Sequence, residues 1–277
     1  MVESQNAYPN YELLADIEWL EERLQQPDLL LLDVRNEGYE QEHIPGARHL
    51  QSDLLKHPGA IEIVPLETAR VALERVGLRG DSTVVLYDDG KSALAARVFY
   101  DLEYYGLRDR VKLLDGGFTA WKAAGKQVTE EVPPAKRGDW SEAVAHPARI
   151  TTKQNIQEGL TNSLLLDVRS AEEYSGANKW NNRKGGHIPG AAWLEWKSAL
   201  ALNEPDGVPR FKPAAVLEKQ LAQVGVRREL TIVPYCQLNS RGAHTYFVLR
   251  LLDFPDVRPY EGAWEEWGND EDTEVSV

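Results

Sequence analysis

Two continuous apolar runs, residues 29–34 and 163–168, are the clearest features of the hydrophobic pattern. Short unbroken runs of this kind are typical of parallel strands that are covered on both faces. Each run is followed, after further segments, by a β-branched or aromatic stretch and then a shorter apolar stretch. The pattern therefore predicts further strands at residues 83–87, 111–114, 231–235 and 257–260.

Between these strands, apolar residues recur with helical spacing. Residues 66–76 and 214–224 show this spacing, and each segment ends at a glycine, Gly77 or Gly225, that can terminate a helix. Two more helices are expected at residues 94–105 and 243–252. The alternation of strands and helices predicts an α/β fold with two doubly wound domains, each a parallel sheet flanked by helices.

The two halves also repeat one another in sequence. A Leu-Leu-Leu-Asp-Val-Arg segment ends at Arg35 and again at Arg169, and His-Ile-Pro-Gly-Ala begins at His43 and again at His187. Ordered matches of this kind indicate an internal duplication, with an insertion in the second copy around residues 175–184. Because the Asp-x-Arg pair occurs in both copies, we interpret it as structural.

The repeat predicts the domain boundaries. We expect one domain at residues 8–124 and a second at residues 150–270. The intervening segment, residues 125–149, contains Pro133-Pro134 and many charged residues, and is predicted to be a linker.

Composition narrows the possible partners and location. The chain has 277 residues, and 31 basic against 44 acidic side chains give a net charge of −13. That charge disfavours nucleic acid or an anionic membrane surface as a partner. The N-terminus is polar and no apolar run approaches the roughly 20 residues of a membrane span. The single cysteine needs no oxidising compartment, so we expect a cytoplasmic protein. We also expect the chain to be a monomer.

No cofactor is expected from the sequence. The six histidines are scattered and no second cysteine is present, so no metal site is predicted. No Gly-rich phosphate-binding loop is present either.

The candidate chemistry lies at Cys236, directly after the predicted strand 231–235. It opens the segment Cys236-Gln237-Leu238-Asn239-Ser240-Arg241, after which a helical pattern begins. A strand, a tight turn and a helix N-terminus direct backbone N–H groups and a positive dipole at one point, which favours a thiolate. A lone cysteine is more commonly a small buried apolar residue. The position at the carboxyl end of a strand favours function instead.

The first copy serves as an internal control. Tyr235-Cys236 aligns with Tyr87-Asp88, so a carboxylate stands where the second copy has sulfur. We therefore expect the first domain to be catalytically silent.

These motifs together resemble the two-domain rhodanese (thiosulfate sulfurtransferase) family. The resemblance covers nearly the whole chain, and the Cys-Gln-x-x-x-Arg loop is most similar to a bacterial subgroup. It implies that Cys236 attacks the outer sulfur of thiosulfate and passes it, as a persulfide, to cyanide or a thiol. Cysteine phosphatases have a loop that is longer by one residue, which makes that activity a weak alternative.

The resemblance also suggests how the donor is bound. Arg241, with the loop residues Gln237, Leu238, Asn239 and Ser240, is expected to bind the substrate. Many family members carry a substrate arginine where this chain has Glu172-Glu173, and Arg183 and Lys184 are candidates to replace it. Asn239 occupies a position that is commonly glycine, and asparagine tolerates a left-handed backbone.

Three functions remain open. The first is transfer from thiosulfate, with a thiol, cyanide, or a thioredoxin-like or other protein as the acceptor. The second uses 3-mercaptopyruvate as the donor. The third is a low-turnover regulatory module that binds a persulfide or an anion.

Overall fold

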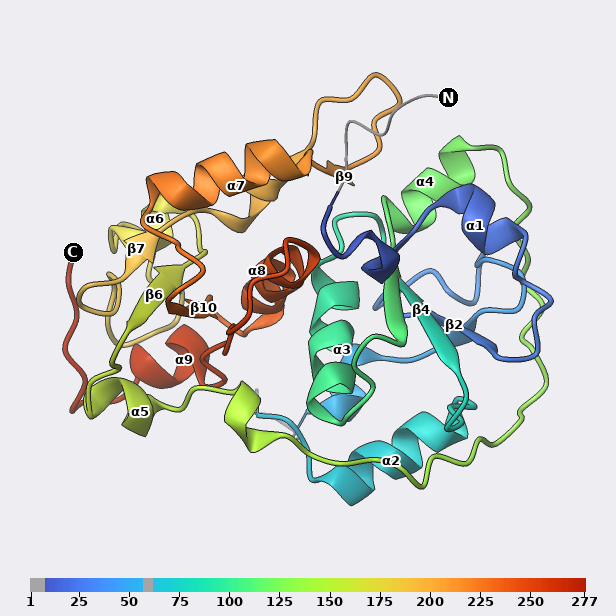
Figure 1. Cartoon of the computed structure of the whole chain (residues 1–277), viewed down its shortest axis with the longest axis horizontal. Coiled ribbons are helices and arrows are strands. Elements are labelled where there is room, and N and C mark those ends of the chain that lie inside the picture. The colour runs from blue at the N-terminus through green and yellow to red at the C-terminus, as the bar shows by residue number, and fades with distance from the viewer. Residues whose placement is uncertain (1–7, 57–61) are drawn as a thin grey trace. The chain divides into compact units, whose positions relative to one another are not determined.

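The computed structural model describes residues 8–56 and 62–277 and divides into two compact α/β units (Figure 1). The N-terminal unit comprises Tyr11–His146 together with Leu200–Phe211. The C-terminal unit comprises Pro147–Ala199, Lys212–Val277 and the chain up to Asn10. Each unit contains one of the two sequence repeats, and the units are described separately here.

The N-terminal unit is built on a five-stranded parallel sheet in the order β1-β5-β4-β2-β3. Its strands are β1 Leu14–Ala15, β2 Leu29–Asp33, β3 Arg48–His49, β4 Thr83–Tyr87 and β5 Val111–Leu114. Its helices are η1 Tyr11–Leu13, α1 Ile17–Glu21, η2 Ser52–Leu55, α2 Leu66–Arg75, α3 Ala93–Tyr104 and α4 Gly117–Ala123. The strands and helices predicted for the first repeat are confirmed to within a residue.

The C-terminal unit has a parallel sheet in the order β10-β6-β7. Its strands are β6 Ser163–Asp167, β7 Ala192–Trp193 and β10 Thr231–Tyr235. Its helices are η3 Pro147–Arg149, α5 Lys153–Gln157, α6 Ala171–Tyr174, η4 Trp196–Ala199, α7 Ala214–Gln223, α8 Ser240–Leu251 and α9 Ala263–Trp267. The short antiparallel pair β8 Leu200–Ala201 and β9 Arg210–Phe211 belongs to the N-terminal unit.

Two details of the second repeat differ from the prediction. Residues 257–260 form no strand and make only single parallel bridges, Val257 to Ile232 and Tyr260 to Thr151. Helix α8 begins at Ser240, earlier than the predicted residue 243. Its first residues are polar, so the apolar pattern does not reveal the first turn.

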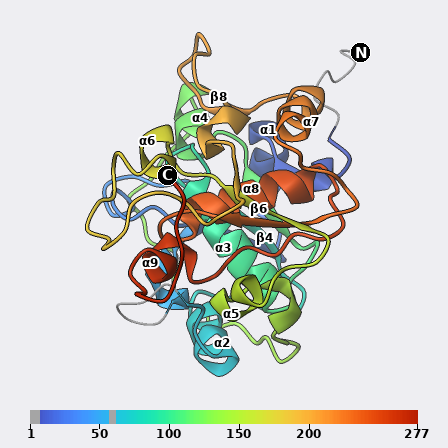
Figure 2. The same cartoon turned by 90° about the vertical axis from the view of Figure 1, so that its left-hand side faces the viewer.

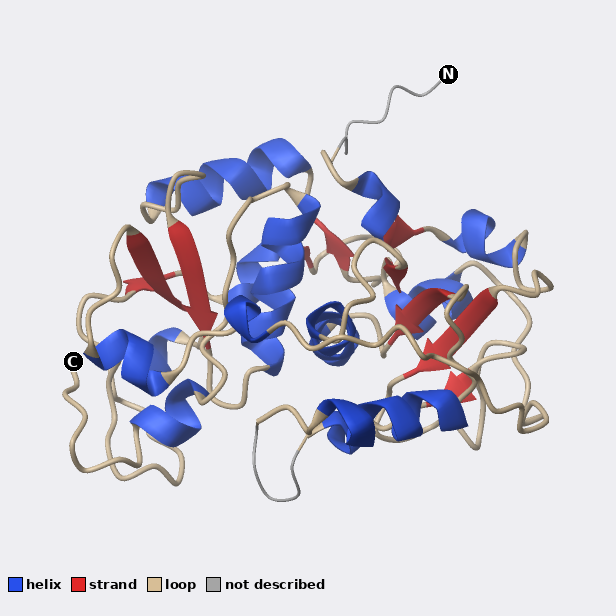
Figure 3. Cartoon of the chain, turned by 60° about the horizontal axis from the view of Figure 1, so that its bottom comes forward, coloured by secondary structure: helices blue, strands red, loops and turns tan. Residues whose placement is uncertain are grey.

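Helices cover both faces of each sheet (Figures 1 and 3). In the N-terminal unit, Trp121 of α4 and residues of α1 pack on Leu31 and Val85 of the sheet. In the C-terminal unit, Trp264 of α9 packs on Val233 of β10. Covering both faces explains why these strands are apolar without alternation. The segment after α9 then runs back along its own unit, where Ser276 bridges His187 (Figure 2).

The predicted linker is packed over most of its length. Residues up to His146 belong to the N-terminal unit, in which Thr129 bridges His43 and Trp140 is 1% exposed. Arg137 pairs with the buried Glu74 at 3.0 Å. The prolines and charges suggested a free segment, but one buried tryptophan is enough to anchor it.

Asp-x-Arg forms the same buried ion pair in each unit. Arg35 binds Asp33 with an N–O distance of 2.6 Å, and Arg169 binds Asp167 at 2.5 Å. Each arginine lies over an aromatic ring in the first turn of α4 or α9, Phe118 at 3.9 Å or Trp264 at 4.2 Å. The duplicated geometry supports a structural role for the pair. Within the described residues, no helix has the length and apolar character needed to cross a membrane.

Candidate active site

Cys236 lies in the turn that joins β10 to α8. The strand ends at Tyr235, and Asn239 caps the helix in a left-handed conformation with φ 63°. The Asn239 side chain donates from Nδ2 to Oε2 of Glu261 at 2.9 Å. An asparagine is therefore sufficient for the turn that glycine would otherwise make.

The turn is held by the segment that begins α9. The backbone N–H of Trp264 donates to the carbonyl of Cys236 at 2.8 Å, and that of Glu265 donates to the carbonyl of Gln237 at 3.1 Å. The N-terminal unit makes the same two bonds, from Phe118 to Asp88 and from Thr119 to Asp89. Both repeats thus place this loop in the same way relative to the sheet.

The corresponding loop of the N-terminal unit shows which group its backbone donors bind. Oδ1 of Asp88 accepts from the N–H groups of Gly90 and Ser92, each at 2.9 Å. Oδ2 accepts from those of Leu94 and Ala95 at 3.0 and 3.3 Å. In the N-terminal unit, a strand, a turn and a helix N-terminus therefore converge their backbone donors on one group. In the N-terminal unit that group is the chain's own carboxylate.

Replacing Asp88 with alanine is expected to destabilise the N-terminal unit by about 2–4 kcal/mol, because it leaves four buried N–H donors without their acceptor. Asparagine at this position keeps one acceptor oxygen and should cost less. Denaturant unfolding measures both. The neighbouring Asp89 is exposed, so Asp89→Ala is the matched control, and an equal loss in the two alanine variants would refute the explanation.

Cys236 itself is only 1% exposed, whereas Leu238 at the tip of the loop is 47% exposed. The sequence-based hypothesis required a sulfur within reach of small anions. In the structure, Cys236 is close in sequence to an exposed loop tip, but its own side chain is covered. Access to Cys236 is therefore the property that decides whether the cysteine can act.

Arg241 points back to the loop and is held by an acidic residue. Its Nη1 and Nη2 bind the two carboxylate oxygens of Glu173 at 2.6 and 2.8 Å. Burial alone would lower the pKa of Arg241, but hydrogen bonds to Glu173 and to the Cys236 side chain outweigh it, and the pKa is raised. The guanidinium group therefore stays charged beside the sulfur.

Glu173 is shifted in the opposite sense. Burial would raise its pKa, but the hydrogen bonds and charge of Arg241 dominate and lower the pKa to about 2. Its side chain is 3% exposed. The pair is thus a desolvated, bidentate ion pair of the kind in which arginine geometry matters.

The pair predicts an acid-dependent stability. Because the folded pKa of Glu173 lies below the unfolded value near 4.5, its contribution is complete above pH 4.5 and is lost as the pH falls toward 2. The contribution is at most about 3 kcal/mol. Unfolding midpoints measured between pH 5 and pH 2.5 should show the advantage of the wild type over Glu173→Gln shrinking as the pH falls. Parallel curves for the two proteins would contradict the assignment.

Gln237 lies in an amide network. Its side chain and that of Asn182 exchange two hydrogen bonds of 3.0 Å, and its Nε2 also donates to Glu265 at 2.8 Å. Asn182 belongs to the insertion of the second repeat. The insertion therefore supports the loop directly, a contact that sequence patterns do not reveal.

The two basic candidates of the insertion are not part of the loop. Arg183 pairs with Glu271 at 2.5 Å, and its side chain is 62% exposed. Lys184 donates to the carbonyls of Glu271 and Thr273. Both side chains hydrogen-bond to the C-terminal segment, and their hydrogen bonds and ion pairs do not include Cys236 or Arg241. Ser240 takes the first position of α8 and is half-buried.

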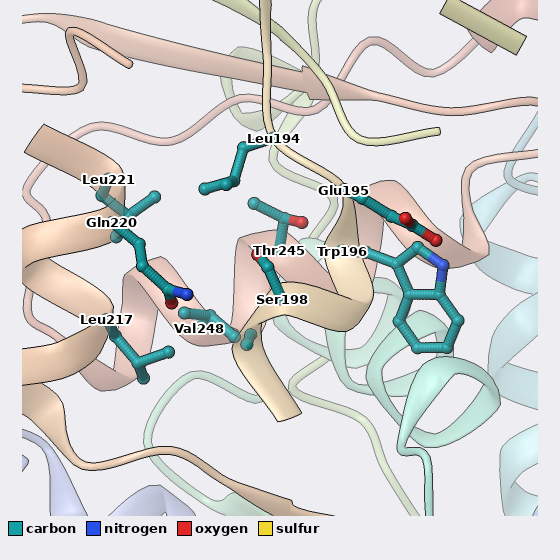
Figure 4. Close-up of a pocket in the computed structure, with 10 residues that line it drawn as sticks. Leu194, Glu195, Trp196, Ser198, Leu217, Gln220, Leu221, Thr245 and Val248 are labelled. Atoms are coloured by element: carbon teal, nitrogen blue, oxygen red, sulfur yellow. The ribbon is translucent and has the colours of Figure 1, made fainter. Parts of the chain in front are cut away.

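A small cavity lies farther along α8, lined in part by Trp196, Leu217 and Thr245 (Figure 4). Its volume of about 20 Å³ has room for one water molecule and not for a sulfur donor. His244 is buried beside it, edge-on to Trp196 at 5.0 Å, and burial lowers its pKa to about 3. A histidine that stays neutral at pH 7 is a packing residue here.

Sequence reasoning missed the acidic partners of the loop, Glu173, Glu261 and Glu265. Glu173 had been noted only as replacing an expected arginine. A signal was present in the repeat, because the residue before Tyr39 is Gly38 whereas the residue before Tyr174 is Glu173.

The comparison with known proteins also distinguishes two domains in the chain. The rhodanese-like domain model matches residues 16–124 and 151–270. Sulfur carrier protein TtuD of Thermus thermophilus is 33% identical over 95% of this chain and 95% of its own length. Thiosulfate sulfurtransferase of Corynebacterium glutamicum is 34% identical over 95% and 89%, respectively. The probable 3-mercaptopyruvate sulfurtransferase of Pseudomonas aeruginosa is 37% identical over 90% and 92%.

Solved structures give the same architecture. The crystal structure of YnjE matches with a TM-score of 0.85 and 26% identity, covering 98% of this chain and 69% of that one. The wild-type structure of EanB matches with a TM-score of 0.84 and 24% identity, covering 96% and 70%. At 24% identity, the second match shows the fold alone.

Proposed function

The chain belongs to the rhodanese-like family in its two-domain form, and from this membership we propose that it is a sulfurtransferase that carries sulfur as a persulfide on Cys236. The observation that supports this most is the setting of Cys236. It lies between a strand end and a helix N-terminus, at the position where the other repeat collects four backbone donors on an anion.

The proposed reaction has two steps. The thiolate of Cys236 attacks the outer sulfur of thiosulfate, a new S–S bond forms, and sulfite leaves with the electron pair of the bond that breaks. Cyanide or a thiolate then attacks the terminal sulfur, which leaves as thiocyanate or a new persulfide and restores the Cys236 thiolate. Nucleophilic catalysis in two half-reactions predicts ping-pong kinetics.

Arg241 is proposed to stabilise the charges at the sulfur. Its guanidinium group interacts electrostatically with Cys236, and it remains protonated. Hydrogen bonds to a charged group contribute roughly 1.5–3 kcal/mol, more than the 0.3–1 kcal/mol of a helix dipole. Gln237, Leu238, Asn239 and Ser240 would form the rest of the binding loop. Arg183 and Lys184 are left out of it.

The donor is the finer part of the proposal. Mercaptopyruvate sulfurtransferases typically have the loop Cys-Gly-Ser/Thr-Gly-Val-Thr. Thiosulfate is preferred because the loop of this chain has neither a glycine after Cys236 nor a terminal threonine. Use of 3-mercaptopyruvate, with pyruvate as the product, is the second candidate, because a relative with that name is 37% identical. Initial rates with each donor and a common thiol acceptor separate the two. A reducing compartment such as the cytoplasm would keep the cysteine free.

The direct test is intact mass after incubation with thiosulfate. Cys236 is the only cysteine in 277 residues, so an increase of one sulfur that cyanide removes reports this residue alone. Because the residue is 1% exposed, alkylation by iodoacetamide is measured in parallel. If neither reagent modifies the folded protein while iodoacetamide alkylates Cys236 in denaturant, the proposal fails. Modification without turnover would favour the low-turnover binding module.

A further inference from the structure

Three polar side chains of the Cys236 loop each bind a carboxylate. The pairs are Gln237 with Glu265 at 2.8 Å, Asn239 with Glu261 at 2.9 Å, and Arg241 with Glu173 at 2.6 Å. A loop that binds an anionic donor would be expected to keep such groups available. Here each of these side chains already contacts a negatively charged group. Only Arg241 is itself positively charged, and its partner is the buried Glu173.

Glu173 is fixed independently of the loop. It closes a capping box at the start of α6, in which its Oε2 accepts from the N–H of Ser170 at 3.1 Å and its own N–H donates to Oγ of Ser170. The capping box therefore fixes the Glu173 carboxylate without any contribution from Arg241. Both carboxylate oxygens also bind the guanidinium group. The result is a pair with no net charge beside Cys236.

The fold does not require this pair. In the silent repeat, the residue before the stacked Tyr39 is Gly38, and the second residue of α3 is Leu94 where α8 has Arg241. The N-terminal unit nevertheless makes the same two hydrogen bonds to its last helix, although its loop has one more residue before the left-handed cap, which is Ser92 instead of Asn239. Glu173 and Arg241 are thus both absent from the repeat that lacks the sulfur, which ties them to the chemistry of the loop.

Resting on the proposed function, we propose that Glu173 is a specificity-determining residue that selects the sulfur donor by charge. By cancelling the charge of Arg241, it removes the preference for a dianionic donor over a monoanionic one that an unpaired guanidinium group beside the sulfur would give. The Coulomb energy between a fixed carboxylate and a donor is proportional to the charge of the donor. Removing the carboxylate therefore changes the affinity for a dianion by about the square of the factor for a monoanion.

Two donors of similar chemistry and different charge make the test. Thiosulfate is a dianion that releases sulfite, and methanethiosulfonate is a monoanion that releases methanesulfinate when its S–S bond breaks in the same way. Steady-state kcat and KM are measured for both with the wild type, Glu173→Gln and Glu172→Gln. Glu172 is the adjacent exposed acid, so its variant changes the net charge equally without touching Arg241.

For Glu173→Gln we expect KM to fall ~10-fold for thiosulfate and ~3-fold for methanethiosulfonate, with Glu172→Gln unchanged. An equal change for the two donors, or a rise in both KM values, would overturn the proposal and indicate that Glu173 only positions Arg241. The same comparison is made as binding affinity in a Cys236→Ser background, where no transfer is needed. If the persulfide test failed, the binding affinities in this background would still test the effect of the Glu173 charge.

Discussion

Alanine at position 236 is expected to abolish sulfur transfer, lowering kcat/KM by about 10⁴-fold or more, because the variant has no nucleophile to form the covalent intermediate. No second cysteine exists that could substitute for it. The measurement is thiocyanate formation from thiosulfate and cyanide, together with the mass of the protein after donor treatment. The variant should show neither product nor adduct.

The comparison needs a folded variant. Cys236 is buried, so Cys236→Ser is measured beside the alanine variant, and circular dichroism and unfolding midpoints establish that both are native. Substantial transfer by either folded variant would show that another group carries the sulfur. It would remove the basis of the proposed mechanism.

The largest effect on stability is expected from Asp167→Ala, a loss of about 3–5 kcal/mol in the C-terminal unit. The aspartate is fully buried and Arg169 is 1% exposed, so the change leaves an uncompensated buried charge. Arg169 also donates to the carbonyl of Gly186 at 2.7 Å, and that bond cannot neutralise it. Urea unfolding followed by tryptophan fluorescence measures the loss.

A surface pair of the same two residue types provides the control. Arg79 and Asp81 lie 2.8 Å apart, and their side chains are 31% and 66% exposed. Solvent screens such a pair, so Asp81→Ala should cost less than about 1 kcal/mol. The difference between the two alanine variants isolates the effect of burial, and similar losses in both would be inconsistent with it.

Much of the fold could be predicted from the hydrophobic pattern. Strands β2, β4, β6 and β10 each contain at least three consecutive apolar residues because both faces are covered, and such runs are visible in the sequence. Residues 257–260 were predicted as a strand too, but they include Arg258 and Pro259, and only single bridges form there. Whether a segment becomes a strand depends on its hydrogen bonds to a neighbouring strand, and the sequence of that segment alone does not reveal them.

The candidate site could be predicted in part. Cys236 and Arg241 lie in one short segment, so their proximity follows from the turn. Glu173 lies 68 positions from Arg241 in the chain, and only the sheet brings α6 beside α8. The packing of residues 125–146 was missed for a similar reason, since the burial of Trp140 depends on a surface formed by distant residues.

Asp88 has a consequence for any attempt to give the N-terminal unit an activity. A ligand attached to the chain is present at a high effective concentration and is not diluted by solvent. The amide donors of that loop are therefore saturated at every substrate level, and a free anion competes with a permanent occupant. Installing cysteine at position 88 would free the amide donors. Gly38 and Leu94 would still supply neither the carboxylate nor the guanidinium group that Glu173 and Arg241 place near Cys236.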